Sequence, residues 1–177
     1  PFYTNYNGFA IMAGVRLVPI ATQAEDGFHL PSQEEIEAHI TPKTRGIIIC
    51  NPNNPTGTVL GMDELDTIRD VALKHNIYVL SDEVYREFIY EGETRSVLDI
   101  EGLEEHAVVM DSLSKRYSLC GGRMGCVISR NKAFMEVVLR FGQARLCAAT
   151  LEQVGSAALV AEGAKYFDPM ISEYRKR

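Results

Sequence analysis

The chain has 177 residues, a formal net charge of −6 and a hydrophobic fraction of 46%. This length is enough for a domain with a sizeable core, and the negative charge argues against a nucleic-acid or anionic-membrane partner. No apolar run approaches the length of a membrane span.

Local patterns predict alternating helices and strands in the first half of the chain. Ser32 and Glu35 have the spacing of a capping box, which begins a helix. The continuous apolar run Gly46–Cys50 follows, and such runs are typical of strands that are buried on both faces of a parallel sheet. In order, we expect a short helical piece over Phe9–Gly14, a strand over Val15–Ile20, a helix from Ser32 to about Ile40, a strand over Gly46–Cys50 and an amphipathic helix over Met62–His75.

The second half continues this alternation. Strands are expected over Ile77–Ser81, Ala107–Asp111 and Gly125–Ser129, with a further short strand near Phe88–Tyr90 as an option. Helices are expected from Asn131 to about Arg145, over Leu151–Gly163 and from Phe167 onward, with Pro169 in the first turn of the last one. The predicted class is α/β, with a mostly parallel sheet and helices on both faces.

Polar side chains follow three of the predicted strands. Asn54 lies in a rigid loop of prolines and asparagines after the first, Asp82 directly follows the second, and Lys115 lies in a turn after the third. In open α/β sheets, ligands bind beyond the carboxyl ends of the strands. We therefore expect these three side chains to meet at one edge of the sheet.

Lys115 is the residue around which this prediction is organised. It lies between two serines at the end of a buried strand, and Arg123 follows eight residues later among glycines. Desolvation and nearby cations lower the pKa of an amine, and the neutral amine can attack a carbonyl carbon. The alternative is a solvated loop lysine, which is what most lysines are.

These residue types match the needs of a pyridoxal phosphate site. Such a site needs a lysine that forms a Schiff base, an aspartate for the pyridinium nitrogen and donors for the phenolic oxygen. The candidates are Lys115, Asp82, and Asn54 with Tyr85, while Ser112 and Arg123 could bind the phosphate.

Each candidate also has a structural alternative. Asp82 could cap the segment after its strand, and Asn54 could be only a turn residue. Ser112 could cap the turn that follows it, Arg123 could be an ordinary ion-pair partner, and Tyr3 and Tyr85 could be core aromatics. No single residue distinguishes its functional role from its structural alternative. The functional interpretation therefore rests on the expected convergence of all the candidate residues at one edge of the sheet.

Three motifs resemble those of class I/II aminotransferases, which are fold-type I pyridoxal-phosphate enzymes. They are Asn54-Pro55-Thr56-Gly57, Ser81-Asp82-Glu83-Val84-Tyr85, and Ser112-Leu113-Ser114-Lys115 with Gly122-Arg123-Met124-Gly125. The motifs occur in the order of the family, and the resemblance covers almost the whole chain. The opening residues and Ser114–Ser118 look most like bacterial aspartate aminotransferase-type members.

The resemblance implies a role for each matching residue. Lys115 would be the Schiff-base lysine and the base that moves the substrate proton. Asp82 would bind the pyridine nitrogen, and Asn54 and Tyr85 the 3′ oxygen. The resemblance also assigns the phosphate to Ser112 and Arg123, and the aromatic stacked on the ring to Tyr3.

It also implies how the chain is organised and what it does. Residues 1–165 would be part of a pyridoxal-phosphate-binding large domain, and residues 166–177 would begin the helix that leads to an absent small domain. The activity would be ping-pong amino-group transfer between an aspartate-like amino acid and a 2-oxo acid in a homodimer, with this fragment inactive alone. A lyase or decarboxylase with the same cofactor, or a non-catalytic sensor domain, stays open.

Cysteine and histidine usage bears on metals and on the cellular compartment. Cys50, Cys120, Cys126 and Cys147 form no CxxC pair, and the four histidines show no metal-ligand spacing. We therefore expect no metal site, and free thiols in a reducing compartment such as the cytoplasm.

Overall fold

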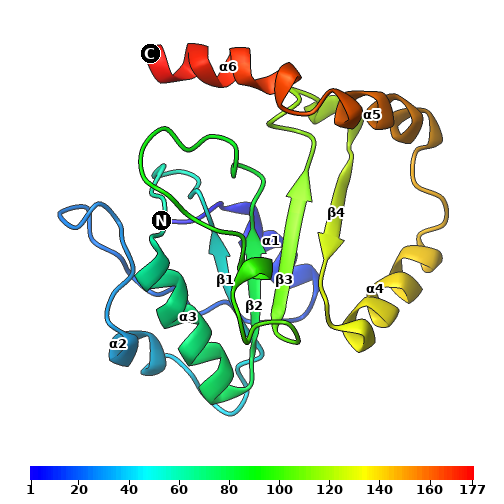
Figure 1. The fold of residues 1–177 in the computed structure, drawn as a ribbon. Coiled ribbons are helices and arrows are strands. Elements are labelled where there is room, and N and C mark those ends of the chain that lie inside the picture. The colour runs from blue at the N-terminus through cyan, green and yellow to red at the C-terminus, as the bar shows by residue number, and fades with distance from the viewer.

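A four-stranded sheet forms the centre of the fold, in a computed structural model that describes residues 1–177 (Figure 1). The strands are β1 (Gly46–Cys50), β2 (Tyr78–Asp82), β3 (Ala107–Ser112) and β4 (Gly125–Ile128). They lie in the order β1-β2-β3-β4. The first three are parallel and β4 is antiparallel to β3, which confirms the mostly parallel α/β sheet.

The register brings the carboxyl ends of the parallel strands to one edge of the sheet. Cys50 pairs with Asp82, and Asp82 pairs with Met110, two residues before the end of β3. Strand-end residues that are far apart in sequence therefore lie beside one another, as the alternation of strands and helices predicted.

Helices lie on both sides of this sheet. Figure 1 shows α3 in front of the sheet and α1 behind it. The α-helices are α1 (Asn5–Met12), α2 (Gln33–Glu37), α3 (Met62–His75), α4 (Lys132–Ala144), α5 (Thr150–Glu162) and α6 (Ala164–Lys176), with 3₁₀ turns η1 (Val97–Asp99) and η2 (Cys120–Gly122). No helix is long and apolar enough to cross a membrane.

Helix α3 supplies much of the core. Its residues Leu65, Ile68 and Val71 recur at helical spacing and are 0–1% exposed. At its start, a Glu64 carboxylate oxygen accepts the Gly61 N–H at 2.9 Å. Its end is marked by Asn76 in the left-handed conformation. Both ends are thus set by local chemistry, while the buried face fixes the helix against the sheet.

Truncating Leu65 should destabilise the fold, because its side chain is 0% exposed. For Leu65→Ala we expect a loss of about 2–5 kcal/mol in the free energy of unfolding, measured by urea denaturation. Leu73→Ala on the same helix is the matched control, since Leu73 is 42% exposed. Equal losses in the two variants would contradict the assignment of this face to the core.

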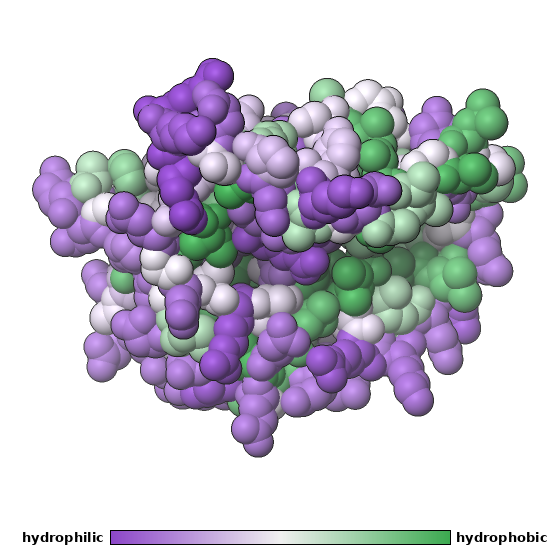
Figure 2. Space-filling view, turned by 45° about the horizontal axis from the view of Figure 1, so that its top comes forward, coloured by the Kyte–Doolittle hydropathy of each residue, from purple (hydrophilic) through white to green (hydrophobic).

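The other side of the molecule leaves apolar residues uncovered. All four residues of β4 are exposed, and α4 contains no buried residue. Figure 2 shows hydrophobic residues (green) gathered on the side that carries β4, α4 and α5. The most exposed of them include Phe141 at 74% and Leu151 at 84%.

Three expectations about secondary structure were wrong. Val15–Ile20 forms no strand, and neither does Phe88–Tyr90. Strand-forming residues need a neighbouring ladder, and the only strand pairs are β1 with β2, β2 with β3 and β3 with β4. Pro169 lies in the interior of α6, not in its first turn, because that helix begins at Ala164, directly after Gly163.

Candidate functional site

The structure brings three of the predicted residues to the same edge of the sheet. Asn54 lies in the loop after β1, Asp82 is the last residue of β2, and Lys115 lies in the turn after β3. Asn54 and Asp82 are half-buried. Lys115 is exposed, so the expected desolvation of its amine by burial was wrong for this chain. Because β1, β2 and β3 are parallel neighbours, the sheet itself explains this convergence.

Asp82 is held from two directions. Its Oδ2 accepts the Tyr6 hydroxyl of α1 at 2.7 Å, and its Oδ1 accepts the Val84 N–H at 3.3 Å. Both bonds orient the carboxylate. The contact with Val84 is also the capping arrangement considered as the alternative role for Asp82.

Sequence reasoning missed Tyr6. Tyr6 is 8% exposed, and burial together with the hydrogen bond to Asp82 raises its pKa far above the usual value for tyrosine. Burial and the nearby Asp82 charge also raise the pKa of Cys50. Both neighbours therefore favour their neutral forms, so neither adds a second negative charge beside Asp82.

Removing the Tyr6 hydroxyl should change how stability depends on pH. The unfolded chain releases the phenol proton above about pH 10, whereas folded Tyr6 retains it, so the free energy of unfolding should fall as pH rises beyond that value. Tyr6→Phe should lack this contribution and should lose about 1.5–3 kcal/mol at neutral pH. Urea unfolding at neutral and alkaline pH measures both effects.

Exposed Tyr90 provides the matched control for this test, as Tyr90→Phe. If Tyr6→Phe and Tyr90→Phe showed the same alkaline slope and the same neutral stability, Tyr6 would not be coupled to Asp82.

Lys115, Tyr85 and Asn54 form a second group beside Asp82. Asn54 Nδ2 donates to the Tyr85 hydroxyl at 3.2 Å. Lys115 Nζ lies over the Tyr85 ring, 5.6 Å from its centroid, which is within cation–π range. An amine, a phenol and an amide from three separate loops thus lie together, as expected for residues that follow parallel strands.

Ser112 and Arg123 are engaged in local bonds. Ser112 Oγ accepts the Ser114 N–H at 3.1 Å and donates to the Met124 carbonyl at 2.9 Å, which is the turn-capping alternative. Arg123 is exposed with a φ of 52°, and its Nη1 donates to the Cys120 carbonyl at 2.8 Å. The hydroxyl and the guanidinium lie at the two ends of the segment that contains Lys115.

Tyr3 lies at the margin of the group. It is 39% exposed, and its ring meets Tyr6 edge-on with centroids 5.7 Å apart. Its hydroxyl accepts a hydrogen bond from Asn5 at 2.7 Å. Tyr3 therefore reaches the Asp82 region through Tyr6.

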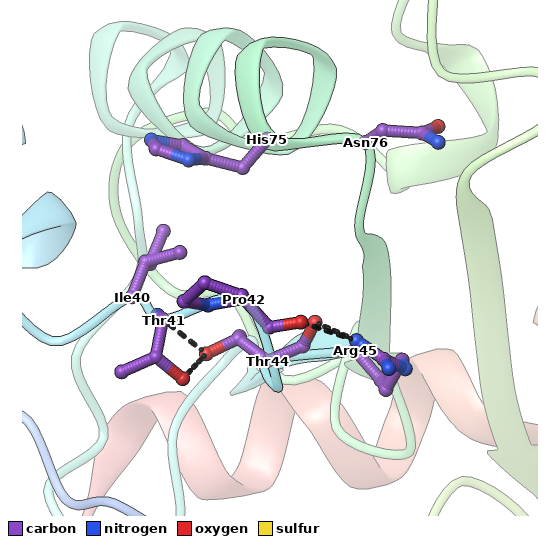
Figure 3. A pocket seen from close by; sticks show the side chains of 7 residues that line it. All are labelled: Ile40, Thr41, Pro42, Thr44, Arg45, His75 and Asn76. Carbon is purple, nitrogen blue, oxygen red and sulfur yellow. Dashed lines mark hydrogen bonds between the residues drawn. The ribbon is translucent and has the colours of Figure 1, made fainter.

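Two hollows in the surface lie elsewhere. One, of about 680 Å³, opens at the amino ends of β1 and β2, where the turn over residues 40–45 faces the end of α3 (Figure 3). The other, of about 290 Å³, is lined by polar residues that include Glu83. Neither of these two hollows is lined by a predicted site residue. The candidate site is defined by its convergent side chains.

Glu83 is a second residue that sequence reasoning left without a role. It is 3% exposed, and one carboxylate oxygen accepts both the Ser81 hydroxyl and the Val97 N–H. Burial raises its pKa. These bonds connect the end of β2 to η1. No group of three or more His, Cys, Asp or Glu side chains is arranged to hold a metal ion.

Comparison with known proteins gives a consistent result. The family described as aminotransferase class I and II matches residues 1–177. Aromatic-amino-acid aminotransferase 2 of Thermococcus litoralis is 34% identical over 100% of this chain and 46% of its own length. Aspartate aminotransferase of Pyrococcus abyssi is 31% identical, with the same two shares.

Solved structures agree with these sequence relatives. The crystal structure of an aspartate aminotransferase from Thermotoga maritima superimposes with a TM-score of 0.90 at 30% identity, over 99% of this chain and 46% of that one. The chain therefore spans about half the length of the relatives it matches.

Proposed function

The chain belongs to the class I and II aminotransferase family, and from this premise we propose that its protein is a pyridoxal-phosphate-dependent aminotransferase. The proposed reaction moves an amino group between an amino acid and a 2-oxo acid. The proposal concerns the whole protein, because the chain spans only about half the length of its relatives. Aspartate-like amino acids are the proposed substrates, supported by relatives named aspartate aminotransferase.

One observation carries the proposal. Asp82, the Asn54–Tyr85 pair and Lys115 meet at the carboxyl ends of three adjacent parallel strands. A carboxylate suits a protonated ring nitrogen, an amide and a phenol suit a phenolic oxygen, and a primary amine suits an aldehyde. The donor set present in the structure therefore fits pyridoxal phosphate.

The protein's own groups have separable tasks in this proposal. When bound, pyridoxal phosphate supplies an aldehyde carbon that condenses with amines and a ring that withdraws electrons from the adjoining carbon. Lys115 Nζ provides an amine nucleophile and afterwards a base that can hold and release a proton. The Asp82 carboxylate, oriented by Tyr6, stabilises positive charge on the ring nitrogen.

The remaining residues would bind and orient the group. Asn54 and Tyr85 would donate hydrogen bonds to the phenolic oxygen, and Tyr3 would stack on the ring. Ser112 and Arg123 would bind the phosphate. Arg123 uses one N–H for the Cys120 carbonyl, and a guanidinium has five N–H donors, so it can keep this bond and still bind an anion.

Assembly, domain division and location belong to the same proposal. The whole protein would be a homodimer, and exposed apolar residues of this chain such as Phe141 and Leu151 would be covered by the partner or by the rest of the protein. Residues 1–165 would belong to the large domain and residues 166–177 would lead to the small domain. All four cysteines are free thiols, which supports a reducing compartment such as the cytoplasm.

A half-reaction tests the proposed chemistry. The whole protein, loaded with pyridoxal phosphate, would be mixed with aspartate or an aromatic amino acid and no 2-oxo acid. Ping-pong transfer predicts one equivalent of 2-oxo acid per site and no further turnover until an acceptor is added. Continuous release of ammonia or carbon dioxide would favour a lyase or decarboxylase, and no reaction would favour a non-catalytic sensor.

A further inference from the structure

Arg116 directly follows Lys115 and is buried between two carboxylates from different parts of the chain. Its side chain is 8% exposed. Nη2 lies 2.6 and 2.7 Å from the two carboxylate oxygens of Asp111, and Nη1 lies 3.3 Å from Glu87 Oε1. One guanidinium thus contacts β3 and the loop after β2.

Both carboxylates lie close in sequence to predicted site residues. Asp111 is in β3, and its Oδ1 also accepts the Ser112 N–H at 2.7 Å. Glu87 lies two residues after Tyr85, in the loop after β2. The planar fork of an arginine can hold two carboxylates in a fixed geometry, which a lysine cannot do.

We propose that Arg116 is a positioning residue that fastens the Lys115 turn to the Tyr85 loop. By binding Asp111 and Glu87 together, Arg116 holds the Lys115 turn and the Tyr85 loop in a fixed position relative to each other. This position keeps Lys115 Nζ over the Tyr85 ring. The importance of Arg116 for amino-group transfer rests on the proposed function. Its role in holding the two loops together rests only on the contacts described above.

The burial of the Arg116 guanidinium favours the positioning role over simple neutralisation of the Asp111 and Glu87 charges. The Arg116 Nε is buried and has no hydrogen-bond partner within the protein. A buried ion pair with incompletely satisfied donors contributes little net stability compared with apolar residues of similar volume. What the guanidinium provides here is a fixed connection between two loops.

The test uses two variants and a matched control in the 177-residue chain. Arg116→Met removes both ion pairs, whereas Glu87→Gln keeps the pair with Asp111 and weakens the link to the Tyr85 loop, together with the pair between Glu87 and its exposed neighbour Arg86. Arg69→Met is the control, because Arg69 also lies between two carboxylates, Asp66 and Asp70, on α3.

Two readouts are measured on each protein. The first is the nuclear Overhauser effect between the Lys115 side chain and the Tyr85 ring, which needs no cofactor. The second is the share of borohydride-reduced pyridoxyl adduct that peptide mapping finds on Lys115. Arg116→Met should lose the first signal and should reduce the second about tenfold. Glu87→Gln should weaken both, and Arg69→Met should change neither.

The outcomes separate this inference from the proposed function. Retention of the Lys115–Tyr85 signal in the folded variants would overturn the positioning role. If circular dichroism showed that Arg116→Met does not fold, Glu87→Gln would decide by the same signal. The proposed function would fail if the unsubstituted whole protein formed no adduct on Lys115, while the nuclear Overhauser effect in this chain would still decide the role of Arg116.

Discussion

Lys115→Ala should abolish the specific reaction of this chain with pyridoxal phosphate. Lys115 Nζ is the amine that the structure places over Tyr85 at the carboxyl edge of the sheet. After addition of the cofactor and reduction with borohydride, peptide mapping should find no pyridoxyl group between β3 and β4. In the whole protein, the same substitution should remove amino-group transfer, because it removes both the nucleophile and the proton-carrying base.

An exposed lysine that is not one of the candidate site residues provides the control. Lys165 is 84% exposed and pairs with Glu162. Lys165→Ala should leave both the adduct on Lys115 and the transfer reaction unchanged. Steady-state transfer that survived Lys115→Ala in the whole protein would refute the assignment of Lys115.

Asp82→Asn should weaken cofactor binding while leaving the side-chain shape intact. The amide oxygen can still accept the Tyr6 hydroxyl, at the cost of the longer bond from the Val84 N–H, but the negative charge that would pair with the ring nitrogen is gone. A hydrogen bond to a charged group contributes about 1.5–3 kcal/mol, which corresponds to a Kd for pyridoxal phosphate about 10–150-fold higher. An equilibrium titration followed by visible absorbance measures this change.

Asp66→Asn is the matched control for this charge change. Asp66 lies on α3, where its carboxylate pairs with Arg69 and its side chain is 47% exposed. Its substitution should not alter cofactor affinity. A normal Kd for Asp82→Asn would show that the carboxylate does not face the bound ring.

Elements with strong local signals could be predicted from the sequence. The apolar run Gly46–Cys50 is β1, and Ser32 with Glu35 forms the expected capping box. Asn131 begins α4 by accepting the Phe134 N–H at 2.9 Å. Each of these depends on residues that are near in sequence, so the pattern contained the necessary information.

Features that depend on distant partners were missed. Val15–Ile20 has the composition of a strand but lies beside no ladder, so its β-branched residues do not form one. The Tyr6–Asp82 bond joins residues 76 apart in sequence. No local pattern predicts such a contact.

The same distinction applies to the candidate site. The convergence of Asn54, Asp82 and Lys115 could be predicted from the expectation of a parallel sheet, because parallel strands end at one edge, and the strand order of the structure agrees with it. The ion pairs of Arg116 with Asp111 and Glu87 could not be foreseen, since a charged residue beside Lys115 was equally compatible with a solvated turn. The roles of Tyr3, Ser112 and Arg123 stay predictions.

The most direct test of the account is a pyridoxal phosphate titration of this chain, followed by borohydride reduction and peptide mapping. We expect saturable absorbance in the visible region and a reduced adduct concentrated on Lys115. An adduct spread evenly over exposed lysines, both in this chain and in the whole protein, would contradict the central claim that this edge of the sheet is a pyridoxal phosphate site.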